Sequence, residues 1–204
     1  MNVMRVPRSP PASVSGECVS AAGFSLVELM VTVTVAAILA AIAMPNLRSY
    51  VQNVRRDSVV DSLVASLHYT RNQALNLDQN ASLCAGTSAV AGTACPAAGA
   101  WNNGWEVITT PASAATATTL TTNALPPVVS APTLTTVNNN LAIAFNPLGL
   151  APTLTNGDEI FVVCDARGIA YARAVEVNAT GYIQSSATPG TVPGGTAIPA
   201  ANCP

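Results

Sequence analysis

A mostly apolar stretch of 21 residues, 24–44, contains a single charged side chain, Glu28, and this combination limits what the chain can fold into. At 1.5 Å per residue, a helix over this stretch spans about 30 Å, which matches the hydrocarbon core of a bilayer. A carboxylate at that depth costs about 2.5–3.5 kcal/mol or more. The sequence therefore predicts a membrane-spanning helix whose one carboxylate needs a partner or a function.

Two common routes for processing an N-terminal apolar segment, cleavage by signal peptidase and lipoprotein maturation, fit these residues poorly. Ala41-Ile42-Ala43 offers an A-x-A site for signal peptidase, but the apolar stretch before it exceeds the usual 7–15 residues and Glu28 interrupts it. A lipoprotein cysteine at Cys18 is excluded because no apolar segment precedes it.

The run Gly23-Phe24-Ser25-Leu26-Val27-Glu28 resembles the processing site of type IV prepilins. The resemblance implies that a membrane prepilin peptidase removes a leader, 1–23, by cutting between Gly23 and Phe24, and methylates the new amine of Phe24. It also implies that Glu28 meets the terminal amine of a neighbouring subunit during assembly. An amine and a carboxylate are each costly in hydrocarbon and much cheaper together. The alternative is that Glu28 is an accidental polar residue that reaches back to the membrane interface.

The composition indicates one extracytoplasmic domain after this helix. The chain has 204 residues, of which 50% are hydrophobic and 9% charged, and it has no lysine. About 130 residues follow the helix, which is enough for one β-rich core and not for two. Without the leader, the six arginines stand against nine acidic residues, so the composition gives no electrostatic footprint for nucleic acid.

Four cysteines remain after the leader is removed: Cys84, Cys95, Cys164 and Cys203. An even number in a chain that crosses the inner membrane predicts two disulfides, with three possible connectivities. We favour Cys84–Cys95, which closes a short local loop, and Cys164–Cys203, which ties the C-terminus to a strand. A metal site lacks the CxxC or HxxxH spacing, and we expect no cofactor.

The arginines do not settle the orientation in the membrane. Arg5 and Arg8 precede the span, whereas Arg48, Arg55 and Arg56 follow it, so counting alone slightly favours the opposite topology. The cysteines and the prepilin resemblance instead predict a C-terminal domain in the periplasm.

The helix is expected to continue beyond the membrane over 45–77. Pro45 cannot donate to the carbonyl of Ala41, which predicts a kink there. Apolar residues then recur every three or four positions and predict one buried stripe, with the charged residues mostly off it. The stripe residues are Leu47, Val51, Val54, Val60, Leu63, Val64, Leu67, Ala74 and Leu75.

Residues 78–204 predict a β-rich domain. Strands are expected at 81–85, 105–109, 141–145, 160–164, 169–177 and 182–185, in an antiparallel sheet, with a loop over 86–100. The uncharged segment 110–140 fits either an exposed loop or weak edge strands.

Several features of the C-terminal part resemble the minor pilins FimT and FimU and the secretion pseudopilin GspH. These are the stretch 67–84, the motif Trp101-Asn102-Asn103-Gly104-Trp105 and the motif 143–149. The resemblance implies an α+β pilin fold, in which a long N-terminal helix, half transmembrane and half amphipathic, packs on a C-terminal antiparallel sheet domain. For the tryptophans, core packing is the main interpretation and a contact surface at a filament tip is the alternative.

DNA binding and catalysis are the competing functions. DNA-uptake relatives are expected to carry a Gly-Arg-x-Arg pattern on the last strand, where this chain has Gly181-Tyr182-Ile183-Gln184. Arg167 and Arg173 stand among acidic residues and would supply little phosphate affinity. No nucleophile elbow, phosphate loop or paired carboxylates indicate an enzyme, and Asp165 beside Arg167 is expected to form a solvated ion pair.

The sequence therefore predicts a minor pilin that primes or caps a type IV pilus. Its expected partners are the prepilin peptidase, other minor pilins, the major pilin and the inner-membrane assembly platform. A GspH-like pseudopilin of a type II secretion system is the alternative, because the N-terminal motif is common to both.

Overall fold

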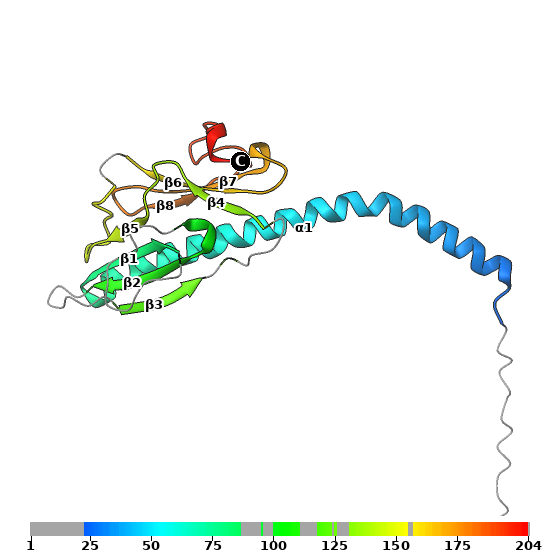
Figure 1. Cartoon of the computed structure of the whole chain (residues 1–204), viewed down its shortest axis with the longest axis horizontal. Helices are drawn as coiled ribbons and strands as arrows, with labels where there is room; N and C mark the ends of the chain where they lie inside the picture. Colours follow the sequence, from blue (N-terminus) through cyan, green and yellow to red (C-terminus); the bar gives the residue numbers. More distant parts are fainter. Residues whose placement is uncertain are drawn as a thin grey trace, which may run out of the picture. The chain divides into compact units, whose positions relative to one another are not determined.

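The computed structural model describes residues 23–86, 95, 100–110, 118–123, 125, 131–154 and 157–203 (Figure 1). The chain divides into two compact units, residues 1–45 and 46–204, which are described separately. Helix α1 (Leu26–Leu77) contributes to both units. The predicted leader, 1–23, lies outside the described residues except for Gly23.

The first unit consists of the N-terminal part of α1. Ser25 caps the helix, because its hydroxyl accepts a hydrogen bond from the backbone N–H of Glu28 at 3.2 Å. Thr32 and Thr34 donate their hydroxyls to carbonyls one turn earlier, so their polar groups are satisfied within the helix. Within the described part of the chain, α1 is the one helix long and apolar enough to cross a membrane, by length and composition.

The second unit contains two four-stranded antiparallel sheets within the described residues. The first has the order β3-β2-β1-β5 and the second β4-β6-β7-β8. The strands are β1 (Asn80–Ala85), β2 (Trp105–Thr110), β3 (Thr118–Asn123), β4 (Thr133–Thr136), β5 (Ala142–Phe145), β6 (Glu159–Cys164), β7 (Arg173–Val177) and β8 (Ile183–Ser185). Three short 3₁₀ helices are η1 (Trp101–Asn103), η2 (Ile169–Tyr171) and η3 (Ala200–Asn202). The predicted α+β class is confirmed.

The main core lies where the second half of α1 packs on residues of both sheets. Leu63 and Leu67 of α1 are fully buried, together with Leu83 of β1, Phe145 of β5 and Phe161 of β6. Successive strand residues point to opposite faces, so Phe161 and Val163 enter this core while their neighbours Val162 and Cys164 do not.

Residues 186–203, which we call the C-terminal cover, close the other face of the second sheet. Val192 and Ile198 pack with Val162 and Ala174 in a separate hydrophobic cluster. The hydroxyl of Thr135 donates to the carbonyl of Asn202 at 2.8 Å, and Cys203 is bonded to Cys164. Strand β6 is therefore shielded from water along most of its length.

Some predicted elements differ from the structure. The predicted strand 169–177 begins only at Arg173, because Gly168 takes a φ of +84° and η2 follows it. In the segment 110–140, edge strands β3 and β4 form, so the edge-strand alternative is correct for the residues described there. The predicted loop 86–100 lies mostly outside the described residues.

The predicted helical stripe is wrong in its first part and at Leu75, which is 45% exposed. Leu47, Val51 and Val54 are 61%, 38% and 50% exposed. The buried stripe begins instead at Arg56 and continues, at three- and four-residue steps, through Val60, Leu63, Leu67, Thr70 and Ala74.

Candidate functional site

The predicted processing site lies in an exposed segment before α1. Gly23, Phe24 and Ser25 precede the first helical residue, and the Phe24 side chain is 81% exposed. A Cβ built on Gly23 would meet nothing within 4 Å. The peptide bond between Gly23 and Phe24 therefore stands clear of the described part of the chain.

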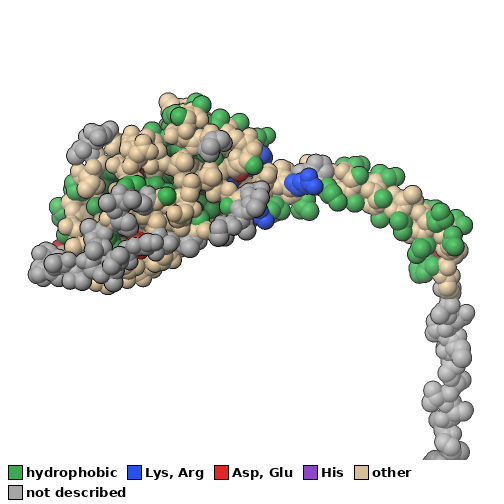
Figure 2. Space-filling view, viewed as in Figure 1, with side chains coloured by type: hydrophobic (Ala, Val, Ile, Leu, Met, Phe, Trp, Pro, Cys, Tyr) green, Lys and Arg blue, Asp and Glu red, His purple; other side chains and the backbone are tan. Residues whose placement is uncertain are grey.

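Glu28 lies in the first turn of α1 and is exposed, like the apolar residues around it. The first turn of a helix carries the positive end of the helix dipole, which favours a carboxylate. Figure 2 shows hydrophobic side chains all along this first part of the helix, with backbone and other side chains between them. Along 26–44, the chain thus presents an apolar surface with one carboxylate near its start.

The cysteines of the predicted disulfides meet in two pairs in the second unit. Cys84 is bonded to Cys95 and Cys164 to Cys203, which is the connectivity favoured from the sequence. The first pair joins β1 to the segment after it, and the second holds the C-terminal cover.

Pro45 lies within α1, and the kink expected there stays a prediction.

An arginine that the stripe prediction placed off the buried face lies inside the second unit. Arg56 is only 3% exposed. Its guanidinium donates to the carbonyl of Tyr171 and to the carboxylate of Asp57, and it stands 3.9 Å from Asp165. Four-residue spacing back from Val60 would have placed Arg56 on the buried stripe, so the sequence carried the signal.

The pair Asp165 and Arg167 is not the solvated ion pair expected from the sequence. The side chain of Asp165 is 3% exposed and accepts hydrogen bonds from the backbone and the guanidinium of Arg167. Arg167 also donates to Asn53 of α1 at 2.7 Å and lies over the ring of Tyr171. Burial alone would raise the pKa of Asp165, but Arg167 and Arg56 together hold that pKa below its ordinary value.

These contacts define a charge cluster of Arg56, Asp57, Asp165, Arg167 and Arg173, in which Arg56 and Asp165 are buried and the others are partly exposed. Arg173 stands 3.9 Å from Asp57, with 21% of its side chain exposed. The cluster fixes α1 against the turn between β6 and β7. Arg167 and Arg173, which the DNA hypothesis would use, therefore face acidic partners within the fold.

Both tryptophans of the Trp-Asn-Asn-Gly-Trp motif belong to the core, so their side chains form no exposed tip surface. Trp105 is 1% exposed and donates its indole N–H to Ser66 at 2.8 Å. Trp101 is 5% exposed, donates to the carbonyl of Asn140 at 2.9 Å and meets Phe161 edge-to-face.

A buried carboxylate, Glu159, supports the segment beside Trp101. It accepts hydrogen bonds from the backbone of Asn138 and the side chain of Asn140. Burial raises its pKa above the ordinary value, although these hydrogen bonds act in the opposite direction. Its contacts are those of a structural group that holds the turn after β4.

The described residues offer little that a catalytic or metal site would need. A cavity of about 470 Å³ between α1 and β3 is lined mainly by apolar side chains, with Arg55 as its one titratable residue. No group of three His, Cys, Asp or Glu residues in the described ranges could hold a metal ion.

The likeness to solved structures is modest. The type IV minor pilin FimU of Pseudomonas aeruginosa strain PAO1 is similar in two crystal forms, each at 18% identity with a TM-score of 0.49. The match covers 72% of this chain and 91% or 96% of the FimU chain. A search of curated protein sequences found no significant match.

Two family models match the sequence itself. The prokaryotic N-terminal methylation motif matches residues 19–44, which include the Gly23–Phe24 bond and Glu28. The family described as type II transport protein GspH matches residues 59–181. Because this second match spans more than half of the chain, the protein belongs to the GspH family of pilin-like subunits.

Proposed function

We propose that the protein is a minor pilin that primes the assembly of a type IV pilus or forms its tip. One observation carries the proposal: the first part of α1 is apolar and exposed all round, with one carboxylate in its first turn. Such a surface is stable only in a bilayer or against other apolar helices. Members of this family are structural subunits and not enzymes.

Before assembly, residues 24–44 would hold the protein in the inner membrane, with 45–77 continuing the helix and 78–204 forming a periplasmic domain. The prepilin peptidase would cut the exposed Gly23–Phe24 bond and methylate the amine of Phe24. The methylation-motif match over 19–44 supports this processing. The two disulfides of the second unit fit an oxidising compartment.

The role proposed for Glu28 is to pair with the terminal amine of a neighbouring subunit. Removing one partner of an ion pair in hydrocarbon leaves the other uncompensated, which is costly. We expect Glu28→Ala to leave cleavage intact and to abolish incorporation into filaments. Thr34→Ala is the matched control, because the Thr34 hydroxyl donates to carbonyls of its own helix. Mutant protein at normal levels in sheared filaments would refute the role of Glu28.

A clean deletion in the native host tests the choice of filament. We expect the deletion to abolish surface pili and twitching and to leave the export of type II substrates normal. This is the result for a minor pilin that works with the major pilin, other minor pilins and the inner-membrane assembly platform. Retained pili with substrates trapped in the periplasm would instead identify a secretion pseudopilin.

The secretion pseudopilin is the second candidate, and a specific observation favours it. The family model that matches residues 59–181 is described as a type II transport protein. Against it, the uncharged segment 110–140 and the two disulfides favour, slightly, a subunit that is exposed on a surface pilus.

DNA uptake is a weaker candidate. Arg167 and Arg173 are held by Asp165 and Asp57, so binding a phosphate would require those ion pairs to be broken. A gel-shift assay at increasing salt would decide: salt-sensitive binding by the purified protein would restore this function.

A further inference from the structure

The turn between β7 and β8 carries an unassigned acceptor pattern for modification of an asparagine. Asn178-Ala179-Thr180 has the Asn-x-Ser/Thr form that an N-linked glycan requires. Asn80-Ala81-Ser82 has the same form. In each case an acidic residue, Glu176 or Asp78, stands two positions before the asparagine.

The fold presents these two tripeptides very differently. In the turn, Ala179 and Thr180 are exposed and Asn178 itself is partly exposed. Asn80 is itself exposed at the start of β1, but Ala81 is fully buried and Ser82 pairs with both neighbouring strands. An enzyme can grip an exposed turn without unfolding the domain, whereas it could reach the strand only if the sheet opened.

The hydrogen bonds of the Asn178 side chain engage its carboxamide oxygen. Its Oδ1 accepts hydrogen bonds from the hydroxyl of Thr180 at 2.6 Å, from the backbone N–H of Thr180 at 3.1 Å and from that of Tyr182 at 2.9 Å. These donors stabilise the negative charge that the carboxamide gains as Nδ2 loses a proton. Nδ2 itself takes part in none of the hydrogen bonds found among the described residues.

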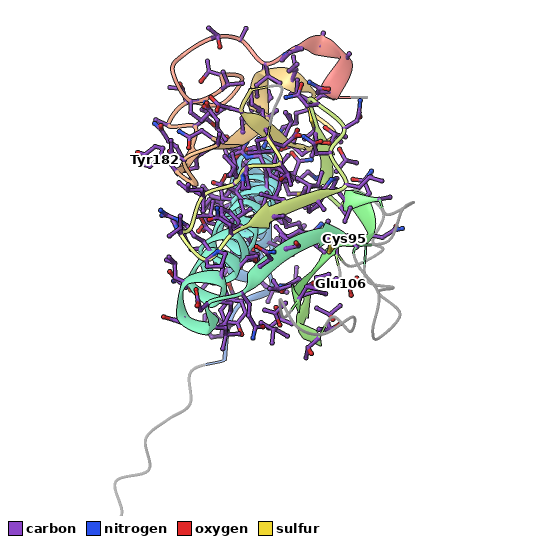
Figure 3. All side chains as sticks on the ribbon, turned by 90° about the vertical axis from the view of Figure 1, so that its left-hand side faces the viewer. Cys95, Glu106 and Tyr182 are labelled. Carbon is purple, nitrogen blue, oxygen red and sulfur yellow. A yellow bond between two sulfur atoms is a disulfide. The ribbon has the colours of Figure 1, made fainter. Side chains whose placement is uncertain are left out.

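The charge beside the turn suits recognition by a cationic groove. Glu176 pairs with Ile160 of β6, and Asp158 precedes Glu159, which pairs with Val177. Two carboxyl groups therefore lie next to Asn178, with the exposed ring of Tyr182 on its other side. Figure 3 shows Tyr182 at an edge of the domain away from Cys95 and Glu106.

We propose that Asn178 is the acceptor of an N-linked oligosaccharide, added outside the cytoplasm to the folded domain. The donor would be an oligosaccharide on a lipid diphosphate. Nδ2 attacks the first sugar carbon, the new C–N bond forms, and the C–O bond to the diphosphate breaks. The lipid diphosphate leaves with the bonding electrons, and the Nδ2 proton passes to a carboxylate of the transferase.

The position of the turn gives such a glycan a physical consequence. Ala179 accepts a backbone hydrogen bond from Ala151 at 3.0 Å, so the turn lies beside the loop after β5. That loop exposes Leu148 and Leu150, and Tyr182 follows the turn. A bulky polar glycan on Asn178 would shield these apolar side chains. The inference goes beyond the proposed function and requires only that residues 46–204 leave the cytoplasm.

Trypsin separates the two acceptor sites, because the chain contains no lysine and few arginines. Full-length protein is recovered from membranes of the native host, reduced, digested and analysed by mass spectrometry. We expect the peptide 174–204 to carry an oligosaccharide mass and the peptide 72–167 to carry none. An unmodified 174–204 peptide, or a glycan at Asn80 alone, would overturn the proposal.

Variants distinguish this linkage from a sugar on the many hydroxyls of the same peptide. Asn178→Gln and Thr180→Val should each abolish the added mass, whereas Thr180→Ser, which keeps the hydroxyl, and Asn80→Gln should retain it. Glu176→Gln should lower the modified fraction several-fold. An added mass that survives Asn178→Gln would place the sugar on a serine or threonine and refute the assignment. Retention of both disulfides in each variant checks that the domain has folded.

Discussion

The two parts of α1 have opposite surroundings although they belong to one helix. Leu39, in the first unit, is 62% exposed, whereas Leu63, in the second, is fully buried against both sheets. The first part satisfies its hydroxyls internally and leaves its apolar surface open. The apolar residues of the second part pack within their own domain. Residues 26–44 thus have their partners in a membrane or in other chains, and residues 56–74 have theirs in this chain.

The test with the largest expected effect replaces leucine by alanine at these two positions. Leu63→Ala should lower the free energy of unfolding of the second unit by about 2–5 kcal/mol, because it leaves a cavity in a closed core. Leu39→Ala, the matched control on the same helix, should leave that free energy unchanged. Denaturation of the full chain in detergent, followed by the fluorescence of the buried tryptophans, measures both. An equal loss in the two variants would contradict the division.

The disulfides sharpen the comparison within the second unit. Cys164 and Cys203 are 39 residues apart and Cys84 and Cys95 only 11. Loop entropy assigns about 4 kcal/mol to the longer loop and about 3 kcal/mol to the shorter. Replacing Cys164 and Cys203 by serine should therefore destabilise more, and it should also expose the cluster under the C-terminal cover. Chemical denaturation and binding of a hydrophobic dye test the order; a larger loss for the Cys84–Cys95 pair would reverse it.

The sequence was most informative where residue chemistry decides the structure. The Gly23-to-Glu28 motif, the apolar span and the four cysteines each depend on residue type, and the α+β pilin fold was implied by the resemblance to known minor pilins. It was least informative where tertiary packing decides which face of a helix is buried. Arg56 was counted among the charged residues that fall mostly off the buried stripe. Its partners, Asp165 and the carbonyl of Tyr171, come from residues more than a hundred positions later.

A buried hydroxyl provides a finer test of how the helix binds its own sheet. Ser66 accepts hydrogen bonds from the indole of Trp105 and the side chain of Asn123, and it donates to the carbonyl of Ser62. Ser66→Ala should cost about 1–3 kcal/mol, because the buried indole N–H loses its acceptor. Ser58→Ala, on the exposed face, is the control with no expected change. A neutral effect at Ser66 would mean that Trp105 finds another partner.

The smallest expected effects are opposite pH dependences of two buried carboxyl groups in the second unit. The pKa of Asp165 is lowered from its ordinary 3.8, so its ionised form stabilises the fold above that pH and the contribution is lost as the pH falls below it. The pKa of Glu159 is raised from 4.5, so its stabilising form is the protonated one, and that contribution is lost as the pH rises from 4.5 through the raised pKa. The unfolding free energy is measured from pH 3 to 7. In Asp165→Asn, its decrease on the acid side should disappear. In Glu159→Gln, the protein should become more stable at neutral pH, relative to its stability at pH 4. Glu28→Gln, in the first unit, should change neither slope, because Glu28 lies in the first turn of α1, outside the second unit. If Glu28→Gln altered the pH profile, the stability of the second unit would depend on the first part of α1, which would contradict the comparison.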